Sequence, residues 1–151
     1  MDSSTATPAT GQEERMLTAH FSLEELTRSG TAIRLGIDNQ PPEEAVVRMQ
    51  ALCEHVLEPL RQRYGRIIVT SGYRSDALNK AVGGVATSQH RLGEAADIYV
   101  ASREKARKYA MFILAHTDFD QLIMEPRGGK VVRWLHVSYT LRRRNRHQTL
   151  S

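Results

Sequence analysis

Residues 88–100 read Ser-Gln-His-Arg-Leu-Gly-Glu-Ala-Ala-Asp-Ile-Tyr-Val. Its second half, from Ala95 to Val100, is short and mostly apolar, which predicts a buried β-strand. His90 and Asp97 are polar side chains that packing around such a strand explains poorly. We therefore treat this stretch as the first candidate for a chemical site.

The flanking segments predict helices and further strands. A capping pattern at Ser22 begins a helix to about Arg28, and Pro41-Pro42 begins the longest helix, which runs to about Tyr64 and should kink at Pro59. The other predicted elements are a strand at 66–70, a short helix from Ser75 to the glycines at 83–84, a helix from Ser102 to about His116, and strands at 119–124 and 132–138. This order predicts an α+β fold, with helices packed on a small, largely antiparallel sheet.

Two more segments carry polar residues next to predicted strands. Thr70–Ser75 follows one strand, and Trp134–Ser138 contains His136. A histidine and an aspartate seven residues apart, together with a distant histidine, offer nitrogen, oxygen and nitrogen ligands. Three protein ligands leave the fourth position of zinc open for water, as in catalytic sites. Spacing alone also allows these histidines to be ordinary core or surface residues.

The composition is that of a soluble globular domain, because 40% of the 151 residues are hydrophobic and 25% are charged. The single cysteine, Cys53, lies on the apolar stripe of the longest predicted helix, so we interpret it as core packing rather than a nucleophile. No stretch approaches the ~20 apolar residues of a membrane span. Residues 1–18 are rich in Ser, Thr, Ala and Gly, and we expect them to be disordered before a domain at 19–140.

Much of the net charge of +4 lies in a basic C-terminal tail at 141–151, which contains Arg142, Arg143, Arg144 and Arg146. Two interpretations stay open: a solvated, frayed tail, or a segment attracted to a polyanion such as teichoic acid, lipid phosphate or nucleic acid. No aromatic residues interleave with these arginines, so base stacking lacks support and nucleic acid is not the expected partner.

Ordered motifs extend from about His20 to Tyr139. They are His20–Ser22, Gly36–Asn39, Ser71–Ser75, Gly83-Gly84, Ser88–His90, Gly93–Asp97 and Trp134–Ser138. Together they resemble the zinc D-alanyl-D-alanine carboxypeptidase family, which includes VanY-type and VanX-type peptidases, phage endolysin peptidases and the hedgehog signalling domain. The resemblance implies a monomeric zinc metallopeptidase of bacterial peptidoglycan peptides, similar to the compact domains that phages and prophages often encode.

By this resemblance, His90, Asp97 and His136 hold Zn²⁺. Zinc lowers the pKa of a bound water towards ~7 and polarises the scissile carbonyl, and a carboxylate must take the proton of that water. Arg74 matches the arginine that holds the substrate carbonyl or the oxyanion.

Ser88 and Gln89 directly precede the first expected zinc ligand. They either line the substrate groove or cap and orient the loop, and the sequence leaves both roles open. The N-terminus has neither a basic n-region nor an apolar h-region, so it does not predict a Sec signal peptide. We expect synthesis in the cytoplasm, and action on the cell wall after release or export.

The general base departs from one common family pattern. Many members place Asp or Glu three residues before the last histidine, where this chain has Arg133. The hedgehog domain instead has Phe-Asp-x-x-x-x-Glu before its last zinc histidine, and this chain has the same run from Phe119 to Glu125. We therefore assign the base to Glu125, with Asp120 as the alternative.

The geometry of the last two strands decides between these carboxylates. A tight hairpin at Gly128-Gly129 would pair His136 with a residue near Gln121 and leave Glu125 about 13 Å away along the strand. An irregular loop at Pro126–Val131 would instead bring the end of the first strand over the metal, because Pro126 has no amide proton for a ladder.

Three functions follow from these patterns. The leading one is hydrolysis of peptidoglycan stem peptides, as carboxypeptidase or endopeptidase. The alternative is a zinc-holding binding module without turnover, and the third is a nucleic-acid-binding protein that uses the arginine tail. Zinc content separates the first two from the third, and release of amino groups from peptidoglycan separates the first from the second.

Overall fold

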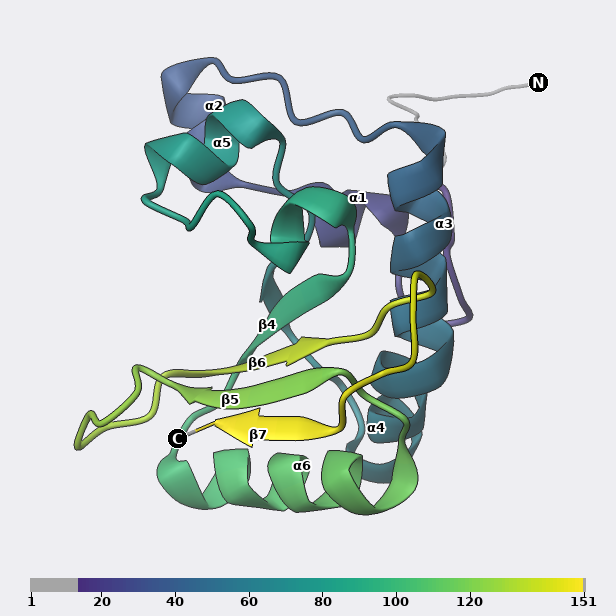
Figure 1. Cartoon of the computed structure of the whole chain (residues 1–151), viewed down its shortest axis with the longest axis vertical. Helices are drawn as coiled ribbons and strands as arrows, with labels where there is room; N and C mark the ends of the chain where they lie inside the picture. Colours follow the sequence, from purple (N-terminus) through teal and green to yellow (C-terminus); the bar gives the residue numbers. More distant parts are fainter. Residues whose placement is uncertain (1–13, 151) are drawn as a thin grey trace.

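The computed structural model describes residues 14–150, and it has the predicted α+β architecture (Figure 1). Its helices are α1 (Leu23–Thr27), α2 (Gly30–Leu35), α3 (Glu43–Leu52), the π-helical η1 (Cys53–Leu57), α4 (Glu58–Tyr64), α5 (Asp76–Ala81), the 3-10 helix η2 (Gln89–Leu92) and α6 (Arg103–His116). Its strands are β3 (Val69–Ser71), β4 (Ala95–Tyr99), β5 (Gln121–Glu125), β6 (Trp134–Ser138) and β7 (Gln148–Leu150). Within the described residues, no helix is both long and apolar enough to cross a membrane.

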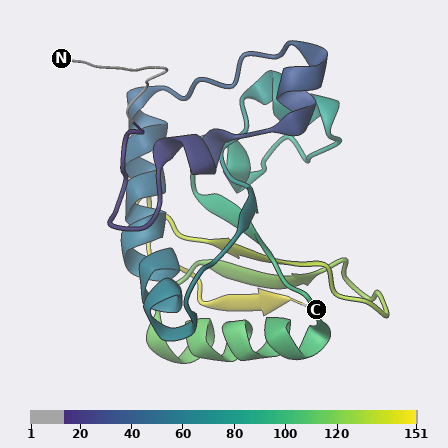
Figure 2. The same ribbon diagram turned by 180° about the vertical axis from the view of Figure 1, so that it is seen from behind.

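The strands form one sheet in the order β3-β4-β6-β5-β7. All neighbouring pairs are antiparallel except β5 and β7, which are parallel. Helix α6 lies along the sheet at the bottom of Figure 1, and Figure 2 shows the same arrangement from behind. Helices α1, α2 and α5 gather at the opposite end of the molecule (Figure 1). This layering confirms the predicted fold class.

The two faces of the sheet have different chemistry because side chains alternate along each strand. Ile98 of β4, with Leu135 and Val137 of β6, are fully buried in the hydrophobic core. Each such side chain stabilises the fold by about 1.5–3 kcal/mol relative to an exposed one. Asp97 and His136 alternate with these core residues, so they point to the other face of the sheet. The core therefore fixes the strands that carry the candidate ligands.

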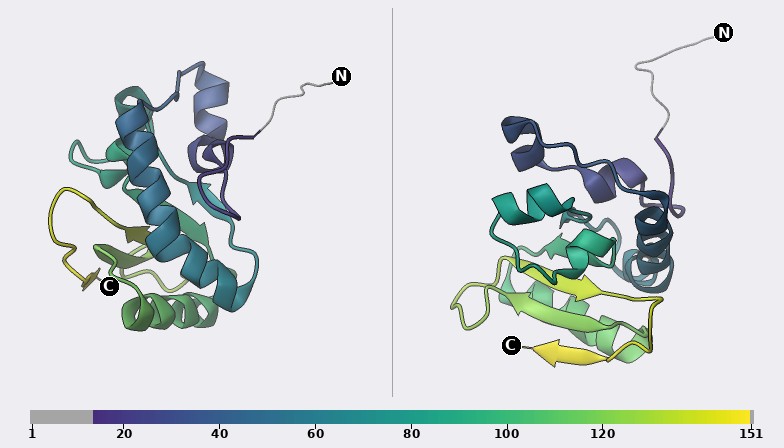
Figure 3. Two further views of the ribbon diagram at one scale, coloured as in Figure 1. Left: turned by 90° about the vertical axis from the view of Figure 1, so that its right-hand side faces the viewer. Right: turned by 45° about the horizontal axis from the view of Figure 1, so that its top comes forward.

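The longest predicted helix is realised as α3, η1 and α4 in succession, which form one rod in the left view of Figure 3. The π-helical turn η1 ends two residues before Pro59, so the predicted irregularity lies directly before this proline. Pro59 cannot donate a backbone hydrogen bond, and its ring would crowd a regular α-helical turn. Cys53 is fully buried in η1 and burial raises the pKa of its thiol, in agreement with a packing role.

The structure corrects the expected N-terminal boundary. Residues 1–13 lie outside the described part of the chain, but residues 14–18 are ordered rather than disordered. Leu17 is buried in the hydrophobic core, and Met16 forms a β-bridge with Ser22. The folded domain therefore begins before residue 19. Helix α2 is a second difference, because no helix was predicted at residues 30–35.

The C-terminal segment also differs from the solvated tail that was one interpretation. Strand β7 adds to the edge of the sheet beside β5. Arg142 contacts the carboxylate of Glu94 at 2.7 Å, and Arg143 and Arg146 contact that of Asp120 at 2.8 and 2.9 Å. Both carboxylates are fully buried. Residues 142–150 therefore belong to the domain, and its predicted end at residue 140 was too early.

A candidate metal centre

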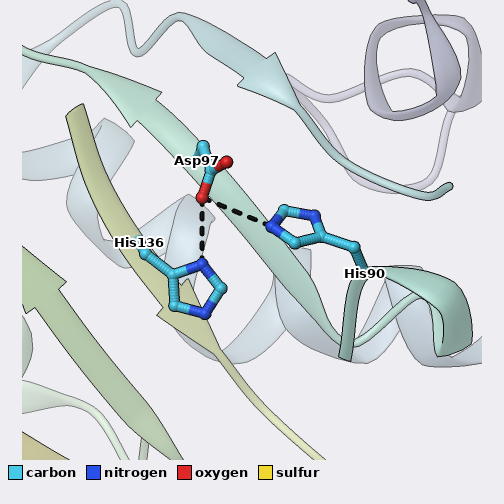
Figure 4. A group of neighbouring side chains, drawn as sticks. All are labelled: His90, Asp97 and His136. Carbon is cyan, nitrogen blue, oxygen red and sulfur yellow. Dashed lines mark hydrogen bonds and ion pairs between the residues drawn. The ribbon is translucent and has the colours of Figure 1, made fainter. Parts of the chain in front are cut away.

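Three polar side chains from distant parts of the sequence converge on one face of the sheet (Figure 4). Asp97 of β4 is the register partner of His136 on β6, so both point the same way. The Oδ1 atom of Asp97 lies 2.9 Å from Nδ1 of His136 and 3.4 Å from Nε2 of His90. All three ligand atoms lie within 4.8 Å of one another.

This donor set fits a zinc ion. Zinc bonds of ~2.0–2.2 Å in tetrahedral geometry place neighbouring ligand atoms roughly 3.3 Å apart, close to the spacing of Asp97 from each histidine. Two imidazole nitrogens and one carboxylate oxygen are ligands that zinc commonly takes. The three residues are buried or nearly so, and the side chain of His136 keeps 14% of its surface exposed. The arrangement can therefore hold a metal with a position left for water.

The turn that carries His90 is fixed at both ends. Ser88 caps η2, because its hydroxyl accepts a hydrogen bond of 3.2 Å from the backbone N–H of His90. Gly93 ends the turn with φ +81°, and a Cβ there would lie 2.5 Å from the backbone oxygen of Ala45. A larger residue at Gly93 would have to displace α3. The motif therefore returns the chain directly from His90 into β4.

A backbone carbonyl orients the ring of His90. The carbonyl oxygen of Gly72 lies 2.7 Å from Nδ1 of His90, and a carbonyl can only accept, so Nδ1 carries the proton. Nε2 is thereby left free to face Asp97 and a metal, which is the usual outer-shell arrangement for a metal-binding histidine. A Cβ at Gly72 would collide with the backbone oxygen of Leu26, so only glycine fits this close approach.

The electrostatics of the centre favour an ionised Asp97. Burial raises the pKa of this carboxyl, but its interactions with the rings of His136 and His90 outweigh burial and hold the pKa well below its usual range. The guanidinium of Arg74 adds a positive charge, 3.7 Å from Oδ2 of Asp97. Asp97 is therefore available as an anionic ligand.

Arg74 reaches the centre from the loop after β3. Its Nε donates to Oγ of Ser71 at 3.3 Å, and a terminal nitrogen donates to Oδ1 of Asn79 at 3.2 Å. Burial lowers the pKa of the Arg74 guanidinium, and the charge of Asp97 opposes that shift. The side chain is only 17% exposed, so it is held beside the metal centre and is not a free surface arginine.

The loop that carries Arg74 is itself pinned by Asn39. The side-chain oxygen of Asn39 accepts from the backbone N–H of Ser75 at 2.7 Å, and its nitrogen donates to the carbonyl of Tyr73 at 3.1 Å. Sequence reasoning placed Asn39 in a matching motif but gave it no role, and it missed Asn79 altogether. A short amide side chain in a loop or helix carries no signal of such a distant partner.

Ser88 and Gln89, the two residues before His90, make contacts that favour a role in orienting the loop rather than in lining the substrate groove. Ser88 caps the turn, and the side-chain nitrogen of Gln89 donates to Glu94 at 2.9 Å and to Asp120 at 3.0 Å. Gln89 thus links the two buried carboxylates that the C-terminal arginines neutralise. The role of either side chain toward substrate stays a prediction.

Asp120, the alternative general base, is occupied by partners outside the metal centre. Its side chain is fully buried, and its two oxygens accept hydrogen bonds from Gln89, Arg143 and Arg146. Burial raises the pKa of Asp120, but the arginines lower it well below its usual range, so the carboxylate stays ionised inside its own cluster. A base so fully occupied has no lone pair to offer to a water on the metal.

Glu125 lies closer to the centre than a tight hairpin would allow. His136 pairs with Ile123 and Trp134 pairs with Glu125, so the ladder is shifted by two residues from the register of a turn at Gly128-Gly129. The predicted irregular loop is therefore present, at residues 126–133. Glu125 lies on the same face as Ile123 and two residues along the strand, roughly 7 Å from the position opposite His136. Its carboxylate accepts from the backbone N–H of Arg127 at 3.2 Å.

Comparison with known proteins agrees with this geometry. The family model described as Peptidase M15 matches residues 19–138, which contain all three converging residues and Arg74. No curated protein gives a significant match to the chain.

Proposed function

The chain belongs to the Peptidase M15 family of metallopeptidases, and on that basis we propose that it is a zinc enzyme that hydrolyses stem peptides of bacterial peptidoglycan. The observation that carries the proposal is the convergence of His90, Asp97 and His136 within 4.8 Å. Two neutral donors and one anionic donor suit a catalytic zinc, which keeps an open position.

In this proposal each of the nearby polar side chains has a separate task. When bound, zinc supplies a water of lowered pKa and polarises the scissile carbonyl. Arg74 donates hydrogen bonds to the carbonyl oxygen as negative charge develops on it. Glu125 takes a proton from the attacking water and passes one to the leaving amine, so that the C–N bond breaks to a carboxylate and an amine.

A second candidate function is a zinc-holding module that binds peptidoglycan without turnover. Two observations favour it: Arg133 occupies the position three before His136, and the Glu125 carboxylate accepts a hydrogen bond from its own loop. That hydrogen bond ties one oxygen of the Glu125 carboxylate to the loop at residues 126–133.

Release of amino groups from purified peptidoglycan tests the proposal. We expect the zinc-loaded protein to release them, a chelator to stop the reaction and added zinc to restore it. Defined peptides that contain D-Ala-D-Ala or L-Ala-D-Glu then identify the bond. Binding to peptidoglycan with no amine released by zinc-loaded protein would instead support the binding module. We also propose that the protein meets this substrate outside the cytoplasm, after release or export.

A further inference from the structure

A cavity of about 270 Å³ opens beside Arg74. Its walls come from the α1–α2 connection, the end of β3, the loop after it and α5, and the right view of Figure 3 shows α2 and α5 side by side above the sheet. A volume of this size is below that of most drug-sized sites, so it suits one or two amino-acid residues. None of the residues assigned to the metal centre lines it except Arg74.

The lining of the cavity has the chemistry of an anion site with one apolar wall. Arg28 and Arg74 supply two guanidinium groups, Ser71 supplies a hydroxyl, and no carboxylate lines the cavity. Among residues 14–150, Arg28 has no hydrogen-bond or ion-pair partner, so its donors are free for a ligand. Leu78 and Val82 of the α5 region form the apolar side, which suits a methyl or short aliphatic group.

The cavity shares two residues with the surroundings of the metal centre. Ser71 is the register partner of Asp97, and Arg74 lies between the cavity and that carboxylate, 3.7 Å from its Oδ2 atom. Successive residues of an extended peptide advance by about 3.3–3.6 Å. Ser71 and Arg74 therefore join the cavity to the surroundings of the metal centre, so an extended peptide could occupy both.

We propose that this cavity binds a free carboxylate of the substrate peptide through Arg28, and so selects peptides with a carboxylate next to the scissile bond. The inference rests on the proposed function and adds a specificity residue to it. Arginine matches a carboxylate with two parallel hydrogen bonds, which a neutral amide cannot reproduce. The carboxylate can be that of the C-terminal residue or that of a glutamate residue in the stem.

Three matched peptides separate these sources: one with every carboxylate free, one with an amidated C-terminus and one with an amidated glutamate. We expect zinc-loaded wild-type protein to cleave the free acid with a kcat/KM about 10- to 100-fold above that of one amide, in line with the strength of charged hydrogen bonds. The amidated peptide with the lower kcat/KM identifies the carboxylate that the cavity binds. The Arg28→Ala variant should cleave all three alike, while Arg28→Lys should recover part of the preference.

Arg34→Ala is the matched control, because Arg34 is an exposed arginine of α2 that does not line the cavity. It should keep the wild-type preference. An unchanged acid-to-amide ratio in Arg28→Ala, or an equal loss for all three peptides, overturns the proposal. If the wild type cleaves none of the peptides, the proposed function fails. Calorimetric binding of the same peptides to zinc-loaded wild type and Arg28→Ala then still decides whether the cavity recognises a carboxylate.

Discussion

Asp97 and His136 stand directly opposite each other on neighbouring antiparallel strands, and Oδ1 of one lies 2.9 Å from Nδ1 of the other. Because a shift of one residue in the pairing would send one of the two side chains to the opposite face, the hydrophobic core that fixes this register also fixes the candidate metal site. His90 is the only expected ligand that a turn rather than a strand positions, and its ring is held by the carbonyl of Gly72.

Arg74 should contribute to turnover rather than to metal binding. Replacement by Ala is expected to lower kcat by roughly 10²–10³, because an oxyanion donor is lost while all three ligands remain. Arg74→Lys should restore little, since a point charge does not reproduce the planar guanidinium. Steady-state kinetics and zinc content of both variants give the answer. Near-normal turnover in Arg74→Ala would remove the residue from the mechanism.

Glu125→Gln keeps the shape of the side chain and removes the base. We expect this variant to retain zinc and lose most peptide hydrolysis, because the proton of the attacking water has no acceptor. Glu104→Gln, an exposed substitution on α6, is the matched control and should behave as the wild type. Full activity of Glu125→Gln in the peptide assay would rule the assignment out.

The C-terminal segment should be needed for the fold. Deletion of residues 142–151 leaves Glu94 and Asp120 as buried carboxylates without their arginines. The loss should lower the free energy of unfolding by roughly 3 kcal/mol or more. We take the lower end of the usual range because the arginine side chains are 38–44% exposed. We expect a clear fall in melting temperature and loss of cleavage of a small soluble peptide. An unchanged melting temperature would show that this segment is dispensable. Attraction of the segment to anionic polymers stays a separate prediction.

The same two carboxylates predict how stability depends on pH. Burial raises the pKa of Glu94, but hydrogen bonds from Arg142, Gln89 and Thr140 lower it overall, as arginines do for Asp120. A carboxyl with a lower pKa in the folded state stabilises the protein above its unfolded pKa of about 4, and that contribution is lost as the pH falls towards the folded pKa.

The melting temperature should therefore fall progressively below about pH 4. Asp118→Asn, an exposed neighbour of this cluster in the chain, should follow the wild-type curve. A melting temperature that stays level from pH 7 to pH 2 would contradict the account of these buried pairs.

Periodicity and capping residues predicted most of the fold, because they report on local backbone preference. Ser22, Ser75 and Ser102 all cap helices as expected. The C-terminal arginines were misread in part because their partners lie far away in sequence: Arg142 contacts Glu94 across 48 residues, and Arg143 contacts Asp120 across 23. A run of charges carries no mark of a buried partner, so a solvated tail was the natural interpretation.

The candidate site was predictable only through its motifs. Spacing could offer His90, Asp97 and His136 as ligands but could not bring them together, since that depends on the register of β4 with β6. The register of β5 with β6 was open for the same reason, because Pro126 and the following glycines left the length of the loop undetermined. The supports of the site, Gly72 and Asn39, act through backbone contacts that a single sequence does not reveal.

The zinc content of purified protein, measured by elemental analysis, tests the central claim most directly. The account predicts one zinc per chain in the wild type and in His116→Ala, whose histidine ends α6 away from the cluster. It predicts an empty site in His136→Ala, because two remaining ligands hold zinc poorly. Stoichiometric zinc in folded His136→Ala would contradict the assignment of the metal centre.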